Sequence, residues 1–197
     1  KTANEKTANE KTANEKTADF TIFTDGCCSG NGTKSSKAAY ATFITDEETK
    51  KSILFYSKLP NGATNIVAEG YAIYYAMNFL VGKKWEVAQI NTDSEFWINM
   101  FTNFMPSWQQ NNIDFATKAN PQLTTSMWKL YKELTSTRKI ILFHVPSHDK
   151  KNWSTSPNAY ERMCSTYNAY VDEMAQWAAN QDIEQNVVYM KNVDVTK

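Results

Sequence analysis

Four acidic residues stand at positions where a carboxylate is costly to bury. Asp25 and Asp93 follow apolar, strand-like segments, and Glu69 and Asp172 lie near the starts of helical segments. Carboxylates gathered at such element ends would repel one another unless a cation lay among them. A pair of divalent metal ions is the simplest such cation, so these acids indicate a nuclease-type metal site.

Each acid alone also fits an ordinary structural role. Near a helix N-terminus, Glu69 and Asp172 could simply offset the helix dipole. Asp25 could be a turn residue before a glycine, and Asp93 could cap the helix that follows it. The functional interpretation therefore depends on all four acids meeting at one sheet.

Phosphodiester hydrolysis is the chemistry that such a site would perform. Two metal ions about 3.5–4 Å apart can activate a water on one side of the phosphorus and stabilise the leaving oxygen on the other. Mg²⁺ prefers oxygen ligands and retains water, so carboxylates suit it better than histidine or cysteine. We therefore expect two Mg²⁺ ions, with Mn²⁺ as a substitute.

The elements that must position these acids follow from the hydrophobic pattern. Strands are predicted at 19–25, 38–46, 51–59, 87–92 and 139–145, where β-branched and aromatic residues are dense. Helices are predicted at 65–81, 94–104, 124–136 and 168–180, with a loop-rich stretch at 105–122. This order predicts one α/β domain whose five-stranded mixed sheet, three antiparallel strands and then parallel ones, is flanked by helices.

Composition places the chain among ordinary single-domain proteins. It has 197 residues, 42% of them hydrophobic, and its apolar runs are strand length, so no membrane-spanning helix is expected. Three cysteines are too few for a disulfide scaffold, and no secretory signal is visible, which favours an intracellular protein of the cytoplasm or nucleus. The 21 basic and 21 acidic residues cancel, which argues against strongly electrostatic nucleic-acid binding unless metals charge the site.

Residues 1–18 consist of KTANE repeats without a large apolar side chain. A period of five matches neither a helix nor a strand, so we expect a disordered or weakly helical tail. The catalytic domain is then expected to occupy residues 19–197.

Five segments, in this order, are similar to motifs of the type 1 ribonuclease H family. They are TDGCCSGNG (24–32), TNIVAE (64–69), TDS (92–94), HVPSH (144–148) and NAYVD (168–172). The DGCC turn and the HVPSH segment resemble the eukaryotic-type catalytic domain most. The resemblance covers about residues 19–181 and implies a ribonuclease H-like fold and a monomer.

The resemblance implies an endoribonuclease that hydrolyses the RNA strand of RNA–DNA hybrids and leaves 5′-phosphates. It implies that the four acids bind the metals and that His148, in a mobile loop, aids proton transfer or product release. Residues implied to contact the substrate are Gly26, Cys28, Gly30, Asn31, Thr64, Asn65, Phe104, Trp108 and Asn120. The turn at 26–32 would read the RNA 2′-hydroxyls. Cys28 could instead be a small buried residue, and Phe104 and Trp108 could pack in the core.

Two features depart from the family pattern. Residues 104–125 hold one Lys and one Asp where relatives are basic, and Gly62 stands where the eukaryotic pattern has an arginine. We therefore expect weaker and less salt-sensitive hybrid binding than a basic relative would show. The connection 149–167 is longer than usual, and its Lys150 and Lys151 could replace that charge, although a solvated insertion is the simpler explanation.

Two other functions remain open at this point. The chain could be a catalytically idle hybrid-binding module, although all four acids are present. It could also be a structure-selective DNA nuclease of the same fold, of the junction-resolvase type, although the turn at 26–32 argues against this.

Overall fold

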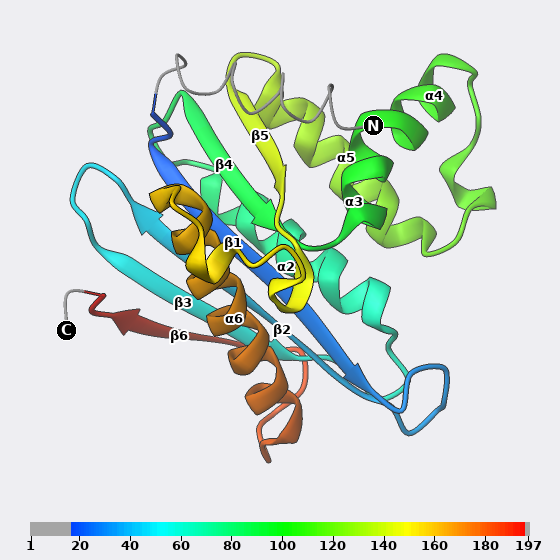
Figure 1. Cartoon of the computed structure of the whole chain (residues 1–197). Coiled ribbons are helices and arrows are strands. Elements are labelled where there is room, and N and C mark those ends of the chain that lie inside the picture. Colours follow the sequence, from blue (N-terminus) through cyan, green and yellow to red (C-terminus); the bar gives the residue numbers. More distant parts are fainter. Residues whose placement is uncertain (1–16, 196–197) are drawn as a thin grey trace.

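Six strands form one mixed sheet in the part of the chain that the computed structural model describes, residues 17–195 (Figure 1). The strands are β1 (Phe20–Ser29), β2 (Lys37–Asp46), β3 (Ser52–Lys58), β4 (Val87–Thr92), β5 (Lys139–His144) and β6 (Val188–Val193). Their order is β5-β4-β1-β2-β3-β6; β5, β4 and β1 are parallel, and the other neighbours pair antiparallel. Most of the KTANE repeats lie outside the described residues, so the disordered tail stays a prediction.

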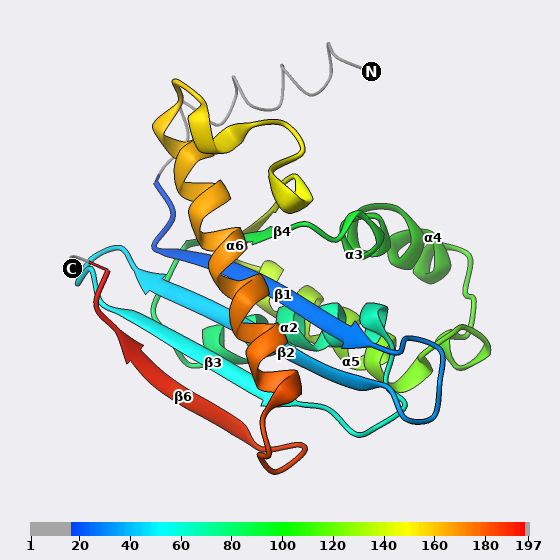
Figure 2. The same cartoon turned by 60° about the horizontal axis from the view of Figure 1, so that its bottom comes forward.

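Helices cover both faces of the sheet, as Figure 2 shows. The helices are α2 (Asn65–Leu80), α3 (Glu95–Asn99), α4 (Met105–Gln110), α5 (Pro121–Thr135) and α6 (Ala159–Asn180). Side chains alternate along β1, so that Phe20 and Ile22 pack with α2 on one face and Phe23 packs with α6 on the other. The α/β fold class is therefore confirmed. None of the helices within residues 17–195 is both long and apolar enough to cross a membrane.

A buried tryptophan fixes α2 against the segment that follows β4. α2 begins at its predicted position, where the Thr64 hydroxyl accepts a hydrogen bond from the Val67 N–H at 3.2 Å. Trp97 of α3 is fully buried and donates from Nε1 to the Ile66 carbonyl at 2.8 Å. A Cβ at Gly70 would lie only 2.5 Å from Cζ2 of the Trp97 ring. The absence of a side chain at Gly70 therefore allows the ring to pack against α2. The start of α2 and the start of α3 are thus held together.

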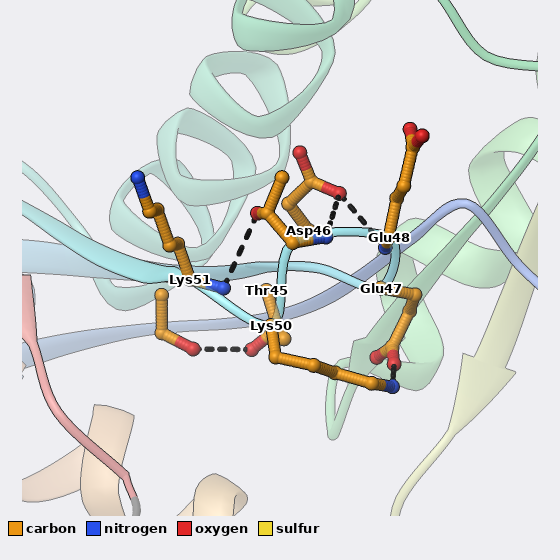
Figure 3. Close-up of polar contacts among 8 residues, drawn as sticks. Thr45, Asp46, Glu47, Glu48, Lys50 and Lys51 are labelled. Atoms are coloured by element: carbon orange, nitrogen blue, oxygen red, sulfur yellow. Dashed lines mark hydrogen bonds and ion pairs between the residues drawn. The ribbon is translucent and has the colours of Figure 1, made fainter.

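The β2–β3 hairpin lies at the end of the sheet where β1 begins, and local polar contacts hold its turn (Figure 3). The Asp46 carboxylate accepts hydrogen bonds from the N–H groups of Glu48 (3.0 Å) and Thr49 (3.3 Å). Lys50 has a φ of 59° and pairs with Glu47 at 2.6 Å. This turn pairs with the first residue of β1 and therefore lies away from the acids.

The C-terminal part of the chain differs from the sequence prediction in two ways. The sheet has six strands rather than five, because β6 pairs with the β3 edge. β6 is short and mostly exposed, so its hydrophobic pattern is weak and the strand depends on the β3 edge for pairing. α6 begins at Ala159 rather than at the predicted residue 168. The sequence did not predict its first turns because they bury few side chains and show little apolar periodicity. Much of the long connection 149–167 is therefore helix.

The loop-rich stretch predicted at 105–122 is also partly helical. The helix that starts as α3 continues through a π-helical turn, η1 (Met100–Phe104), into α4. Pro106 follows the π turn and lies in the first turn of α4, where its missing N–H cannot donate to the preceding helical turn, which fits a local change in the hydrogen-bond pattern. A proline that predicts a helix end therefore marks a change of helix type here.

Candidate active site

β1 extends beyond the parallel strands β4 and β5 at the end of the sheet that bears the acids. β4 ends at Thr92, paired with Thr24 of β1, and β5 ends at His144, paired with Thr92. β1 continues to Ser29. Asp25 therefore lies inside a strand rather than at its end, which corrects the sequence prediction. Asp25 still pairs with Ala41 of β2, so it is the end of β4 on its other side, rather than the end of β1, that leaves room around its side chain.

The four acids reach this position from four different elements. Asp25 is buried in β1, with 5% of its surface exposed, and Asp93 directly follows β4. Glu69 lies in the first turns of α2. One carboxylate oxygen from each of these three lies within 4.8 Å of the others. Asp172 of α6 is the fourth acid, and all four line one cavity of about 320 Å³.

Gly26 permits the close approach of α2 that brings Glu69 to the site. A Cβ at this position would lie 2.3 Å from the Glu69 nitrogen and 2.4 Å from the Ala68 carbonyl carbon. Atoms at those distances overlap, and both are backbone atoms that cannot rotate away. A glycine directly after Asp25 therefore positions a second acid as well as the first.

Burial and mutual repulsion raise the pKa of the central acids. Burial raises the pKa of Asp25 well above its ordinary value, and the charges of Asp93 and Asp172 raise it further. A hydrogen bond to Asp172 acts in the same direction, because Asp25 donates it only when protonated. Burial, assisted by the Asp93 charge, also raises the pKa of Glu69 to about 7. Without a cation, the site therefore resists the simultaneous ionisation of Asp25, Glu69 and Asp93.

Neighbouring polar groups partly offset this repulsion at Asp93. Burial and then the Asp172 charge raise the pKa of Asp93, whereas a hydrogen bond from Asn168 and the two nearby histidines lower it. The donors around the acids thus favour their charged forms, as a metal site requires.

Three side chains that support the acids were missed by the sequence prediction. Ser94 hydrogen-bonds to Glu69 and also caps α3. Gln176 donates to Asp172 Oδ2 at 3.1 Å, and Asn168 donates to Asp93. The spacing of four between Asp172 and Gln176 on a helix was the available signal.

The donor set fits a hard divalent cation. Its members are carboxylate oxygens that converge on one cavity from the sheet and from the helices on its two faces. Because these carboxylates repel one another, binding of a cation between them is favourable. Asn65 donates to Glu69 Oε1 at 3.2 Å, which restrains the orientation of that carboxylate. The ligands that would hold such ions are Asp25, Glu69, Asp93 and Asp172.

His148 lies at the rim of the acid cavity. It is exposed, has a φ of 51°, and also lines an adjoining cavity of about 120 Å³ with Asp93 and Asp172. His144 ends β5, and its Nε2 lies 3.7 Å from Glu95 Oε1. The Glu95 charge is therefore directed at an imidazole rather than at Asp93.

The turn after β1 is tied to the start of α2. The Cys28 thiol donates to the Ala63 carbonyl at 3.2 Å, and Asn31 Oδ1 accepts from the Asn65 N–H at 3.1 Å. Gly30 has a φ of 69° in the turn itself. Gly26, Cys28 and Asn65 line the acid cavity, while Gly30, Asn31 and Thr64 do not line it directly.

Phe104, Trp108 and Asn120 meet in a separate groove of about 260 Å³. Phe104 is 51% exposed, and its ring centre lies 6.4 Å from that of Trp108. Asn120 has a φ of 52° and immediately precedes α5. Phe104 lies outside the core, which argues against the core-packing alternative for this residue, whereas Trp108 is half-buried and packs against the edge of the core. The groove also includes Phe96, three residues after Asp93, so it lies next to the acids along the chain.

A mixed sheet with helices on both faces and acids from β1, α2, β4 and α6 defines an α/β protein with a candidate cation site. The fold is that of ribonuclease H domains: the solution structure of the PFV RNase H domain matches with a TM-score of 0.63 and 19% identity, covering 83% of this chain and 96% of that one. A family model described as RNase H matches residues 17–180, so the chain belongs to the ribonuclease H family.

Curated relatives from bacteria and mammals agree with this membership. A Ribonuclease H of Clostridium botulinum (strain Hall) is 29% identical over 144 residues, 73% of this chain and 88% of the relative. A Ribonuclease H1 of Rattus norvegicus is 29% identical over 127 residues, 64% of this chain and 43% of the relative. The chain is therefore an enzyme of the ribonuclease H type.

Proposed function

We propose that this protein is a metal-dependent endoribonuclease that hydrolyses the RNA strand of RNA–DNA hybrids. One observation carries the proposal: oxygens of Asp25, Glu69 and Asp93 lie within 4.8 Å of one another, with Asp172 in the same cavity. Membership in the ribonuclease H family supports the substrate class. The products would be a 5′-phosphate and a 3′-hydroxyl.

The four acids would act as ligands of two Mg²⁺ ions, or of Mn²⁺ in their place. When bound, such ions supply an activated water and neutralise charge on the leaving oxygen. The raised pKa values of Asp25, Glu69 and Asp93 mean that protons compete with cations for these carboxylates. Activity at limiting Mg²⁺ should therefore increase with pH as the carboxylates lose their protons.

His148 would exchange a proton with the departing 3′ oxygen or assist product release. The position of His148 at the cavity rim supports this role, since an exposed imidazole can reach both substrate and solvent. Its left-handed backbone lies in the connection between β5 and α6, apart from the rigid sheet.

The two strands of a hybrid would occupy two different surfaces. The RNA strand would pass over the acid cavity, where backbone and side-chain groups of the β1–β2 turn and the start of α2 could contact 2′-hydroxyls. The residues proposed for this surface are Gly26, Cys28, Gly30, Asn31, Thr64 and Asn65. The DNA strand would lie along the groove of Phe104, Trp108 and Asn120, whose aromatic rings suit stacking on sugars or bases.

Cleavage of three labelled duplexes tests this proposal. A hybrid, a DNA duplex and an RNA duplex are each incubated with the protein and either Mg²⁺ or a chelator. We expect cleavage of the hybrid alone, in the RNA strand, and only with Mg²⁺. Hybrid binding without cleavage would instead indicate a binding module, and cleavage of DNA would indicate a structure-selective DNA nuclease.

A further inference from the structure

Lys118 occupies a fixed position beside the aromatic groove. It follows a single 3₁₀ turn, η2 (Phe115–Thr117), and its N–H donates to the Phe115 carbonyl at 3.1 Å. The Asp114 carboxylate caps this turn by accepting from the Ala116 N–H at 2.9 Å. The carboxylate closest in sequence to Lys118 is therefore engaged with the backbone.

The Lys118 ammonium lies over a tryptophan rather than against an acid. Its Nζ is 5.0 Å from the Trp108 ring centre, and that ring makes a T-shaped contact with Phe115, with ring centres 5.2 Å apart. No ion pair of Lys118 occurs among residues 17–195. A cation held by a ring face keeps its three donors for another acceptor.

The groove itself is mostly apolar, with Lys118, Asn120 and Thr124 as its polar side chains. It is lined by Phe96, Trp97, Met100, Phe104, Trp108, Lys118, Ala119, Asn120 and Thr124. Lys118 is the one charged side chain among the described residues that line it. Aromatic rings that accept stacking, together with a single cation, match a sugar–phosphate strand, whose apolar faces alternate with regularly spaced anions.

We propose that Lys118 binds one backbone phosphate of the nucleic-acid strand that lies in this groove, and that it is the groove's principal electrostatic contact. This inference rests on the proposed function and names the residue that would replace the basic surface missing from 104–125. Binding would transfer the ammonium from the Trp108 ring toward the phosphate and leave that ring face free to stack. Binding of a strand in the groove would thus neutralise one phosphate, and release the counterion of one phosphate, instead of several.

A second lysine–tryptophan pair in the same region provides a matched control. Lys132 of α5 lies 5.8 Å from the Trp128 ring centre. Both residues line a different groove of about 490 Å³, which shares no lining residue with the first. Replacing Lys132 removes the same charge and the same kind of ring contact without touching the groove beside Asp93.

The experiment measures hybrid binding against salt in an Asp93→Asn background, which is expected to bind without cutting. Association constants are compared for Lys118→Gln, Lys118→Arg and Lys132→Gln over a range of KCl concentrations. We expect Lys118→Gln to lower the magnitude of the salt slope by about 0.7–0.9 and to weaken binding by about 3- to 10-fold at low salt. Lys118→Arg should retain the slope, and Lys132→Gln should match the parent.

The outcomes separate this inference from the proposed function. If the protein with Asp93 intact cleaves the hybrid while Lys118→Gln leaves the slope unchanged, the role of Lys118 is overturned and the enzyme activity stands. Equal losses in Lys118→Gln and Lys132→Gln would also overturn it, because they would indicate a diffuse field rather than a contact. If the hybrid binds with the expected Lys118 dependence but is not cleaved, the inference stands and the activity fails. Absence of hybrid binding would overturn both.

Discussion

The acid cavity and the aromatic groove are neighbouring surfaces built in opposite ways. The cavity collects carboxylates from four elements, and backbone contacts such as that between Gly26 and α2 fix their positions. The groove is formed mainly by one continuous stretch, from α3 to the start of α5, and holds exposed rings and one lysine. Changes in the cavity should therefore affect chemistry and folding, whereas changes in the groove should affect affinity alone.

The largest expected effect is the loss of cleavage in Asp93→Asn. The amide keeps the shape of the side chain but removes one anionic ligand, so we expect hybrid cleavage to fall by about 1,000-fold or more. Affinity for the hybrid should change by less than about threefold, because the groove is untouched. Single-turnover cleavage and direct binding measure the two quantities. Glu95→Gln is the matched control, since Glu95 is exposed beside Asp93 and faces His144; a similar loss there would argue for a general charge effect.

Gly26→Ala should be the most disruptive substitution for the fold of the site. The added Cβ would overlap backbone atoms of Ala68 and Glu69, so α2 must shift away from β1. We expect the free energy of unfolding to fall by about 2–4 kcal/mol, with loss of cleavage as Glu69 leaves the site. Urea denaturation and a cleavage assay measure both effects.

Gly32→Ala is the comparison for that substitution. Gly32 has a φ of 85° in the β1–β2 turn, but a Cβ there meets no atom within 4 Å. Only the backbone strain remains, which costs about 1 kcal/mol. Equal destabilisation by the two substitutions would mean that the close approach of α2 does not depend on Gly26.

The metal-free cavity should make stability depend on pH. The folded pKa of Glu69, about 7, lies above its ordinary value of 4.5, so the folded protein holds this proton more tightly than the unfolded chain does. Stability from this group is therefore greatest below about pH 4.5 and is lost as pH rises toward 7. Because Glu69 is only half-buried, we expect a loss of about 1–2 kcal/mol.

Comparison with Glu69→Gln isolates this contribution. Denaturation of both metal-free proteins at pH 5 and pH 7.5 should show the variant gaining about 1–2 kcal/mol relative to the parent at the higher pH. Added Mg²⁺ should reverse the ranking, because it stabilises only the protein that retains the ligand. A constant difference across the two pH values would contradict a raised pKa at Glu69.

The acids of the cavity were predicted from the sequence, whereas the strand ends and neighbouring side chains around them were not. The identities and order of Asp25, Glu69, Asp93 and Asp172 are local features that a single chain displays. Whether Asp25 ends a strand is not local, since its exposure to the cavity depends on where β4 ends. The same reason explains β6, which needs the β3 edge, and Ser94, whose bond to Glu69 depends on the packing of α2 against α3.

The π turn shows a different limit of sequence reasoning. Pro106 correctly marks a disturbance of the helix, but whether the chain leaves the helix or changes its pitch is decided by burial. Met100, Phe101 and Met105 are buried, and their packing keeps the segment helical across the disturbance. Phe104 is left exposed on the same turn. Tertiary contacts therefore determine that Phe104 faces the groove. The hydrophobic periodicity alone does not distinguish between a core and a surface position for this residue.

The smallest expected effect comes from the connection between β5 and α6, where Lys150 and Lys151 are exposed next to His148. The Asp149 carboxylate binds the Ser154 N–H at 3.0 Å, so the connection is tied to itself rather than to the groove. Replacing both lysines with alanine should therefore change hybrid affinity by less than about twofold and reduce the salt slope less than Lys118→Gln does.

Lys50 and Lys51 are the matched pair for that substitution, because they lie in the β2–β3 hairpin at the opposite end of β1. Their replacement by alanine removes the same formal charge, together with the Lys50–Glu47 ion pair, far from both surfaces, so it measures the effect of net charge on hybrid binding. Replacing Lys150 and Lys151 could lower the salt slope of hybrid binding more than this control and more than Lys118→Gln. In that case the main cationic contacts with the phosphates lie beside the acid cavity. The division between a catalytic cavity and a binding groove would then be wrong, since one surface would perform both tasks.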